Sequence, residues 1–100
     1  MQDIKNFLDE QGRLIRFPAK QRMKIQALAY LATKFDAGKV YSEKQVNETL
    51  ELWHTFHDPA TLRRELFDFR FMDRTPDCRE YRLCDPLPDY ESPSNSTPNT

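Results

Sequence analysis

The sequence predicts an α+β, mainly helical domain of the winged helix-turn-helix type, and three observations lead to that prediction. Apolar residues recur at helical spacing within residues 19–35, 43–54 and 59–69. The second and third of these segments begin with strong helix-start signals. The order of elements is helix, short extended segment, two helices joined by a short turn, and a C-terminal β-hairpin. This order is that of a winged helix.

The composition indicates one small folded domain with a polar tail. The chain has 100 residues, of which 38% are hydrophobic and only two are glycine. We expect the domain at residues 1–84 and a disordered tail at residues 85–100, which are rich in proline, serine and asparagine. No segment approaches the roughly 20 apolar residues that span a bilayer. We therefore expect a cytoplasmic protein without a membrane partner.

The N-terminal part predicts two short elements. Residues 3–9 can form a helix that Gly12 stops. Residues 13–17 alternate charged or polar with apolar side chains, with Leu14 facing inward, and Pro18 ends the segment. This segment is expected to be a short strand or an extended arm.

The longest predicted helix covers residues 19–35, and Gly38 lies beyond its end. Its apolar stripe consists of Met23, Ala27, Leu28, Leu31 and Phe35. After the break at Gly38, Val40 and Tyr41 are expected to form a short extended segment. The basic side chains of the helix lie largely off the stripe and should face solvent or a partner.

Local signals mark the starts of the next two helices. Ser42 and Gln45 form a capping-box pattern, so a helix should begin after Ser42 and end near His54. Asp58 followed by Pro59 supplies an N-cap and a proline at the first helical position. These two helices should form the helix-turn-helix pair.

The second helix of the pair and the hairpin after it carry the functional prediction. Residues 59–69 should bury Leu62, Leu66 and Phe69, with Phe67 at the margin. The exposed face should then present Thr61, Arg63, Arg64 and Asp68. A turn of sequence Thr-Pro-Asp-Cys separates residues 71–74 from residues 79–84, which should pair as the hairpin.

The charge distribution favours a nucleic-acid partner, and double-stranded DNA in particular. The net charge is −1, yet residues 13–35 carry six basic side chains and no acidic one. The guanidinium group of arginine matches both phosphate and the major-groove edge of guanine. The predicted nucleic-acid contacts are Lys20, Arg22, Thr61, Arg63, Arg64, Arg74 and Arg79. The sequence leaves open whether the basic segment shares a face with the arginine pair.

A second interpretation remains open, because winged helices also act as dimerisation and protein-docking modules. Glu65 and Asp68 share the helix with the arginines, and the spacing of Arg64 and Asp68 permits an intrahelical pair. The alternative function is therefore a protein-interaction module, with a second copy or another protein as its partner.

Catalytic and metal sites are not predicted. The chain lacks a glycine-rich phosphate loop, a nucleophile elbow and a pair of residues placed for acid-base catalysis, so we expect neither an enzyme nor a cofactor. His54, His57, Cys78 and Cys84 are possible zinc ligands by type. Their spacing contains no Cys-x-x-Cys pair and does not favour a metal site.

Four stretches together resemble a known prokaryotic family. They are GRLIRFPAKQRMK, YSEKQVNETL, DPATLRREL and DRTPDCREY, and the resemblance covers about residues 12–83. Over this range the chain resembles an uncharacterised domain of unknown function. That domain occurs in small stand-alone proteins and is also found appended to bacterial transcriptional regulators. The matching positions are Pro18, Lys20, residues 41–47 and residues 62–64. The resemblance implies a regulator-like domain that binds nucleic acid.

The chain departs from the family pattern at two positions where glycine is usual. Arg70 follows the second helix of the pair, and Cys78 lies in the hairpin turn. A positive φ angle at either position would be strained without glycine. We therefore expect the hairpin to differ in shape or length from that of its relatives.

Overall fold

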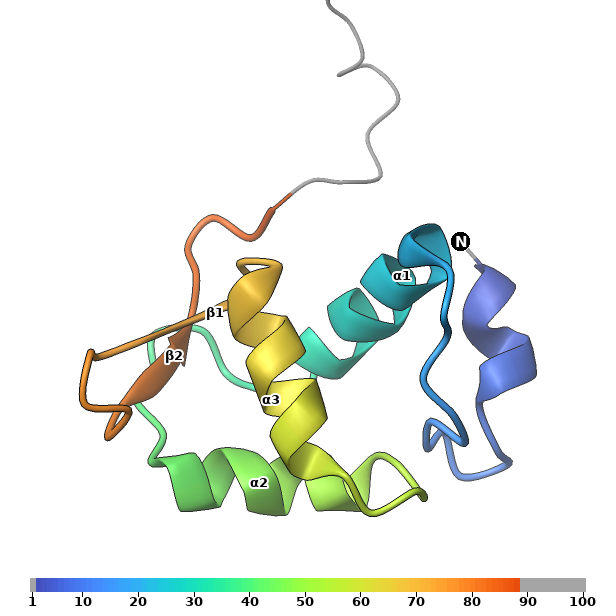
Figure 1. The fold of residues 1–100 in the computed structure, drawn as a ribbon, viewed down its shortest axis with the longest axis horizontal. Helices are drawn as coiled ribbons and strands as arrows, with labels where there is room; N and C mark the ends of the chain where they lie inside the picture. Colours follow the sequence, from blue (N-terminus) through green and yellow to red (C-terminus); the bar gives the residue numbers. More distant parts are fainter. Residues whose placement is uncertain (1, 89–100) are drawn as a thin grey trace, which may run out of the picture.

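The computed structural model describes residues 2–88 and confirms an α+β, mainly helical fold of winged helix-turn-helix type. The elements in chain order are the 3₁₀ helix η1 (Gln2–Phe7), the helices α1 (Gln21–Ala32), α2 (Glu43–Leu52) and α3 (Pro59–Asp68), and the strands β1 (Met72–Arg74) and β2 (Tyr81–Leu83) (Figure 1). In the part of the chain that the structure describes, none of the helices combines the length and apolar character that a bilayer crossing requires. Most of the predicted tail lies outside the described residues.

The N-terminal segments are less regular than predicted. The helix expected at residues 3–9 is a 3₁₀ helix, because so short a segment cannot sustain a cooperative α-helix. The arm at residues 13–17 is not a strand of a sheet, but its Leu14 is fully buried as expected. The Leu14 N–H donates to the Trp53 carbonyl at 2.8 Å, and the Thr55 N–H donates to the Leu14 carbonyl at 2.9 Å. The arm is thereby fixed to the turn between α2 and α3.

Both predicted helix starts are confirmed. The Gln45 N–H donates to Ser42 Oγ at 3.1 Å, and the Ser42 N–H donates to Gln45 Oε1 at 2.8 Å. Asp58 Oδ1 accepts a hydrogen bond from the Thr61 N–H at 3.3 Å, and Pro59 is the first residue of α3. Each cap satisfies helix donors that would otherwise lack an intrahelical partner.

The predicted hairpin of β1 and β2 is joined by a third extended segment at Tyr41. Strands β1 and β2 pair antiparallel, with Met72 opposite Leu83. Tyr41, from the predicted extended segment, then pairs with Tyr81 on the other edge of β2 through N–H to carbonyl bonds of 2.8 and 2.7 Å. This pairing ties the segment before α2 to the hairpin.

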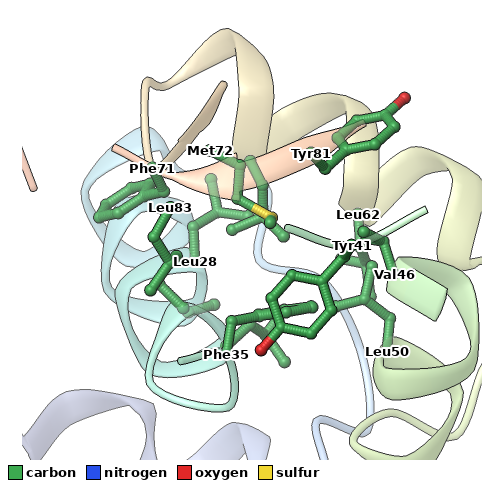
Figure 2. Packing of buried hydrophobic residues seen from close by; sticks show 14 of the residues in the cluster. Leu28, Phe35, Tyr41, Val46, Leu50, Leu62, Phe71, Met72, Tyr81 and Leu83 are labelled. Carbon is green, nitrogen blue, oxygen red and sulfur yellow. The ribbon is translucent and has the colours of Figure 1, made fainter. Parts of the chain in front are cut away.

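The core lies between the three α-helices and the hairpin (Figure 2). Leu28 of α1, Leu50 of α2 and Leu62 of α3 are fully buried and come from three different helices. Met72 of β1 and Leu83 of β2 close the cluster from the hairpin side. The hairpin is therefore part of the folded domain and holds a fixed place beside α3.

Positive φ angles occur at both positions where the sequence analysis expected a conformation that suits glycine. Arg70 has φ 69° and Cys78 has φ 62°, so both non-glycine residues lie in the left-handed region. This confirms the strain expected from the sequence. At Cys78 the conformation lets the Cys78 N–H donate to the Thr75 carbonyl at 2.8 Å, which closes the hairpin turn.

Replacing Arg70 by glycine is expected to raise the free energy of unfolding by about 0.5–1 kcal/mol, because relief of left-handed strain exceeds the added chain entropy of glycine. Arg70 is exposed, and its N–H bond to the Phe67 carbonyl survives the change. Urea denaturation measures the difference. The matched control is Arg82→Gly in the exposed middle of β2, where the same substitution should destabilise. A loss of stability in Arg70→Gly would contradict the strain argument.

Candidate functional site

Three of the predicted contact residues lie exposed on α3 and the hairpin turn. Thr61 and Arg64 are exposed on α3, where the Arg64 side chain is 81% exposed. Arg79 follows the hairpin turn, and its side chain is 84% exposed. Arg64 lies 3.9 Å from Asp68 on the same helix, which is the intrahelical pair that the spacing permits. Pairs of this kind between exposed side chains are weak, so Arg64 remains free to reach a partner.

Arg63 does not lie on the exposed face of α3 as the sequence analysis predicted. Its side chain is only 17% exposed, and its Nη2 lies 3.6 Å from Glu43 Oε2 at the start of α2. Its Nη1 also donates a hydrogen bond to Asn47 Oδ1. The physical reason is that α3 packs across α2, so the residue beside buried Leu62 turns toward α2. Arg63 therefore fastens α3 to α2.

The basic residues at the start of α1 do not share a surface with the hairpin arginines Arg74 and Arg79. Lys20 is the N-cap of α1 and Arg22 is in its first turn. Figure 1 shows that α1 begins at the side of the molecule opposite the hairpin. Lys24 of the same segment instead lies 4.0 Å from Glu65 of α3. The positive charge at the start of α1 is thus separate from that of Arg74 and Arg79.

A pocket of about 360 Å³ opens between the start of α2, the outer side of α3 and the hairpin. It brings three arginines together with two carboxylates, a phenol, a thiol and a phenyl ring. Its lining residues are Glu43, Arg63, Arg64, Phe67, Asp68, Arg74, Cys78 and Tyr81. We call it the arginine pocket.

Arg74 lies in this pocket instead of projecting from the hairpin. Its guanidinium carbon is 4.2 Å from the centroid of the Phe67 ring, and its Nη1 donates to Cys78 Sγ at 2.8 Å. Strand alternation places Arg74 on the same face as buried Met72, two residues before it. That alternation is a signal from which the inward position could have been predicted.

Tyr81 is a pocket residue that the sequence analysis did not identify as functional. It is the register partner of Arg74 and is buried at its ring. Figure 2 shows its hydroxyl directed away from the core cluster. Burial raises the pKa of Tyr81, and the nearby charge of Arg63 opposes that rise. The hydroxyl is therefore a neutral hydrogen-bond donor at physiological pH.

The net charge of the site is small. The arginine pocket sets three guanidiniums against the carboxylates of Glu43 and Asp68, so its formal charge is +1. On α3, Arg63 and Arg64 are balanced by Glu65 and Asp68. Long-range attraction of a polyanion by this surface is accordingly weak.

The residues weighed as zinc ligands do not form a metal site. The His54 ring is occupied by backbone groups, because its Nδ1 lies 2.6 Å from the Leu50 carbonyl and its Nε2 accepts from the Asp58 N–H at 2.8 Å. His57 is exposed and lies near Glu51. Within residues 2–88, no cluster of three or more histidine, cysteine, aspartate or glutamate side chains is arranged to hold a metal ion.

Comparison with known proteins places the chain in a family. The family model described as "Uncharacterized protein conserved in bacteria (DUF2087)" matches residues 13–83, which is most of the chain and close to the range of the resemblance. No curated protein and no solved structure matches the chain.

Proposed function

We propose that this chain, which belongs to that bacterially conserved family, binds nucleic acid as a transcription-regulator domain and favours double-stranded DNA. The observation that carries the proposal is the exposed Arg64 on the second helix of the helix-turn-helix pair, flanked by a hairpin with exposed Arg79. In this architecture the second helix enters the major groove and the hairpin reaches flanking phosphates. Thr61 lies one helical turn before Arg64 and extends the same ridge.

The proposed interface is narrower than the predicted set of residues. Arg63 acts by holding α3 on α2, since its guanidinium is already engaged by Glu43 and Asn47. Lys20 and Arg22 belong to the start of α1, which lies across the molecule from the hairpin, and they are excluded from the interface. The direct contacts are therefore Thr61, Arg64 and Arg79.

The near-neutral surface sets an expectation for salt dependence. The two exposed arginines can neutralise about two phosphates, so the slope of log K against log salt should be about −2. A strongly basic non-specific binder would show a much steeper slope. The proposed domain should instead obtain affinity from groove contacts made by α3.

A charge-matched pair of double variants tests the proposal. Arg64→Gln with Arg79→Gln should weaken duplex binding by about a hundredfold or more, because each of the two charged contacts contributes about 1.5–3 kcal/mol. Lys20→Gln with Arg22→Gln removes the same charge and should change affinity little. Fluorescence anisotropy with a labelled duplex library, at two salt concentrations, measures both. Equal losses in the two variants, or no salt-sensitive binding by the native chain, would refute this interface.

A protein-interaction or dimerisation module is the second candidate. Two observations favour it: α3 carries balanced charges, and Leu52 at the end of α2 is 68% exposed. An exposed leucine at a helix end can make a hydrophobic contact with a partner protein. Single exposed apolar residues are also common on protein surfaces. Sedimentation velocity across a range of concentrations discriminates the two functions. A chain that dimerises but binds no duplex supports this candidate.

A further inference from the structure

The arginine pocket has the chemistry of an anion site. We propose that it binds the phosphate group of a small phosphate monoester, with Arg74 as the principal cation. The inference does not rest on nucleic-acid binding, because it concerns a pocket between α2, α3 and the hairpin and a free small ligand. Its volume of about 360 Å³ lies at the lower end of the range for small-molecule sites, so the ligand is small.

Arg74 carries the argument because its charge lacks a counter-ion. Its contacts are the Phe67 ring face and Cys78 Sγ, and among residues 2–88 no carboxylate pairs with it. A thiol sulfur is a weak acceptor, so it satisfies the guanidinium poorly. Half-buried cations ordinarily gain a paired anion. An incoming phosphate would supply that partner without displacing a carboxylate from Arg74.

Two further arginines and a tyrosine line the same pocket as Arg74. Arg63 is engaged by Glu43 and Asn47, so it contributes a positive charge that is fixed in the pocket wall, and Arg74 and Arg64 make the direct contacts. Arg64 stands at the exposed mouth, where its contact with Asp68 at 3.9 Å is loose enough to be exchanged for a ligand. Tyr81 adds a neutral hydroxyl donor.

Phosphate fits this set of donors better than a carboxylate does. A phosphate monoester carries about two negative charges and three acceptor oxygens, so it can engage more than one guanidinium at once. Glu43 and Asp68 also line the pocket and repel any anion. Because the formal charge of the pocket is +1 and Arg74 has no carboxylate partner, a dianion gains more from it than a monoanion does, which favours phosphate over carboxylate.

The strained backbone at Cys78 is consistent with a ligand site. Its φ of 62° belongs to the left-handed region, and its thiol is the polar partner of Arg74. Strain of this kind concentrates at ligand clamps and active sites. The Cys78 sulfur accepts from the same guanidinium that lies over the Phe67 ring.

Calorimetric titration of the full chain with phenyl phosphate tests the inference. Benzoate carries the same ring with a carboxylate in place of the phosphate. Its affinity should be lower than that of phenyl phosphate by about tenfold or more. Arg74→Gln should weaken phenyl phosphate binding by about tenfold or more. Arg64→Gln should also weaken phenyl phosphate binding, and because the Arg64 side chain is 81% exposed we expect the variant to fold. Arg22→Gln removes the same charge outside the pocket and should leave binding unchanged. Circular dichroism verifies that Arg74→Gln is folded.

The outcomes separate this inference from the proposed function. Absence of phenyl phosphate binding at millimolar concentration would overturn the inference, even if duplex binding is found. Equal affinity for benzoate would overturn the assignment of phosphate. If Arg22→Gln lost as much affinity for phenyl phosphate as Arg74→Gln, the ligand would be attracted by the overall charge of the protein. That result would also overturn the inference. Phenyl phosphate binding that depends on Arg74, in a chain that binds no duplex, would support the pocket and refute the nucleic-acid proposal.

Discussion

Replacing Leu28 by alanine is expected to lower the free energy of unfolding by about 3–4 kcal/mol, because the change removes buried methyl groups and leaves a cavity. Leu28 is fully buried near the middle of α1, and Figure 2 shows it within the cluster that joins the helices to the hairpin. Since α1, α3 and the strands all border this space, no single element can move to fill it. The loss is a large part of the total stability of a small domain.

Leu52→Ala is the matched control. The substitution is the same and the residue is also helical, but Leu52 is 68% exposed at the end of α2. We expect it to change stability by about 0.5 kcal/mol or less. Urea unfolding followed by circular dichroism measures both variants. If the two substitutions cost the same, Leu28 does not occupy a packed core and the arrangement of α1 against the hairpin is wrong.

The elements that the sequence predicted well are those with local signals. Ser42 with Gln45, and Asp58 with Pro59, mark helix starts within four residues of chain, so no knowledge of tertiary structure is needed. The inward position of Leu14 followed from alternation within its own short segment. The backbone groups that pair with Leu14 belong to Trp53 and Thr55, some 40 positions later in the chain. No local pattern identifies such distant partners.

The orientation of the site residues depended on packing that local patterns do not encode. Helical spacing leaves Arg63 at the edge of the buried stripe, and only the crossing of α3 over α2 decides that it turns toward Glu43. The arginine pocket likewise joins residues from Glu43 to Tyr81, which meet only in the folded domain. The inward side chain of Arg74 is different, because strand alternation already implied it.

The turn between α2 and α3 depends on one buried ring. His54 is 3% exposed and stacks edge-on against Phe56 with centroids 4.6 Å apart. The Asp58 N–H donates to its Nε2 at 2.8 Å, so Nε2 is the unprotonated nitrogen. Nδ1–H must then donate to the Leu50 carbonyl at 2.6 Å. One neutral imidazole thus bridges the last turn of α2 and the cap residue of α3.

His54→Ala is therefore expected to lower the free energy of unfolding by about 2–3 kcal/mol, since it leaves a cavity and removes two hydrogen-bond partners. Urea unfolding measures the loss, and hydrogen exchange should show faster opening of the first turn of α3, because Asp58 loses the bond that fixes it. His57→Ala is the control: that side chain is 87% exposed and its nearest carboxylate, on Glu51, is 3.9 Å away. Its expected cost is about 0.5 kcal/mol or less. Unchanged exchange in His54→Ala would mean that the angle between the two helices is set by the leucine core alone.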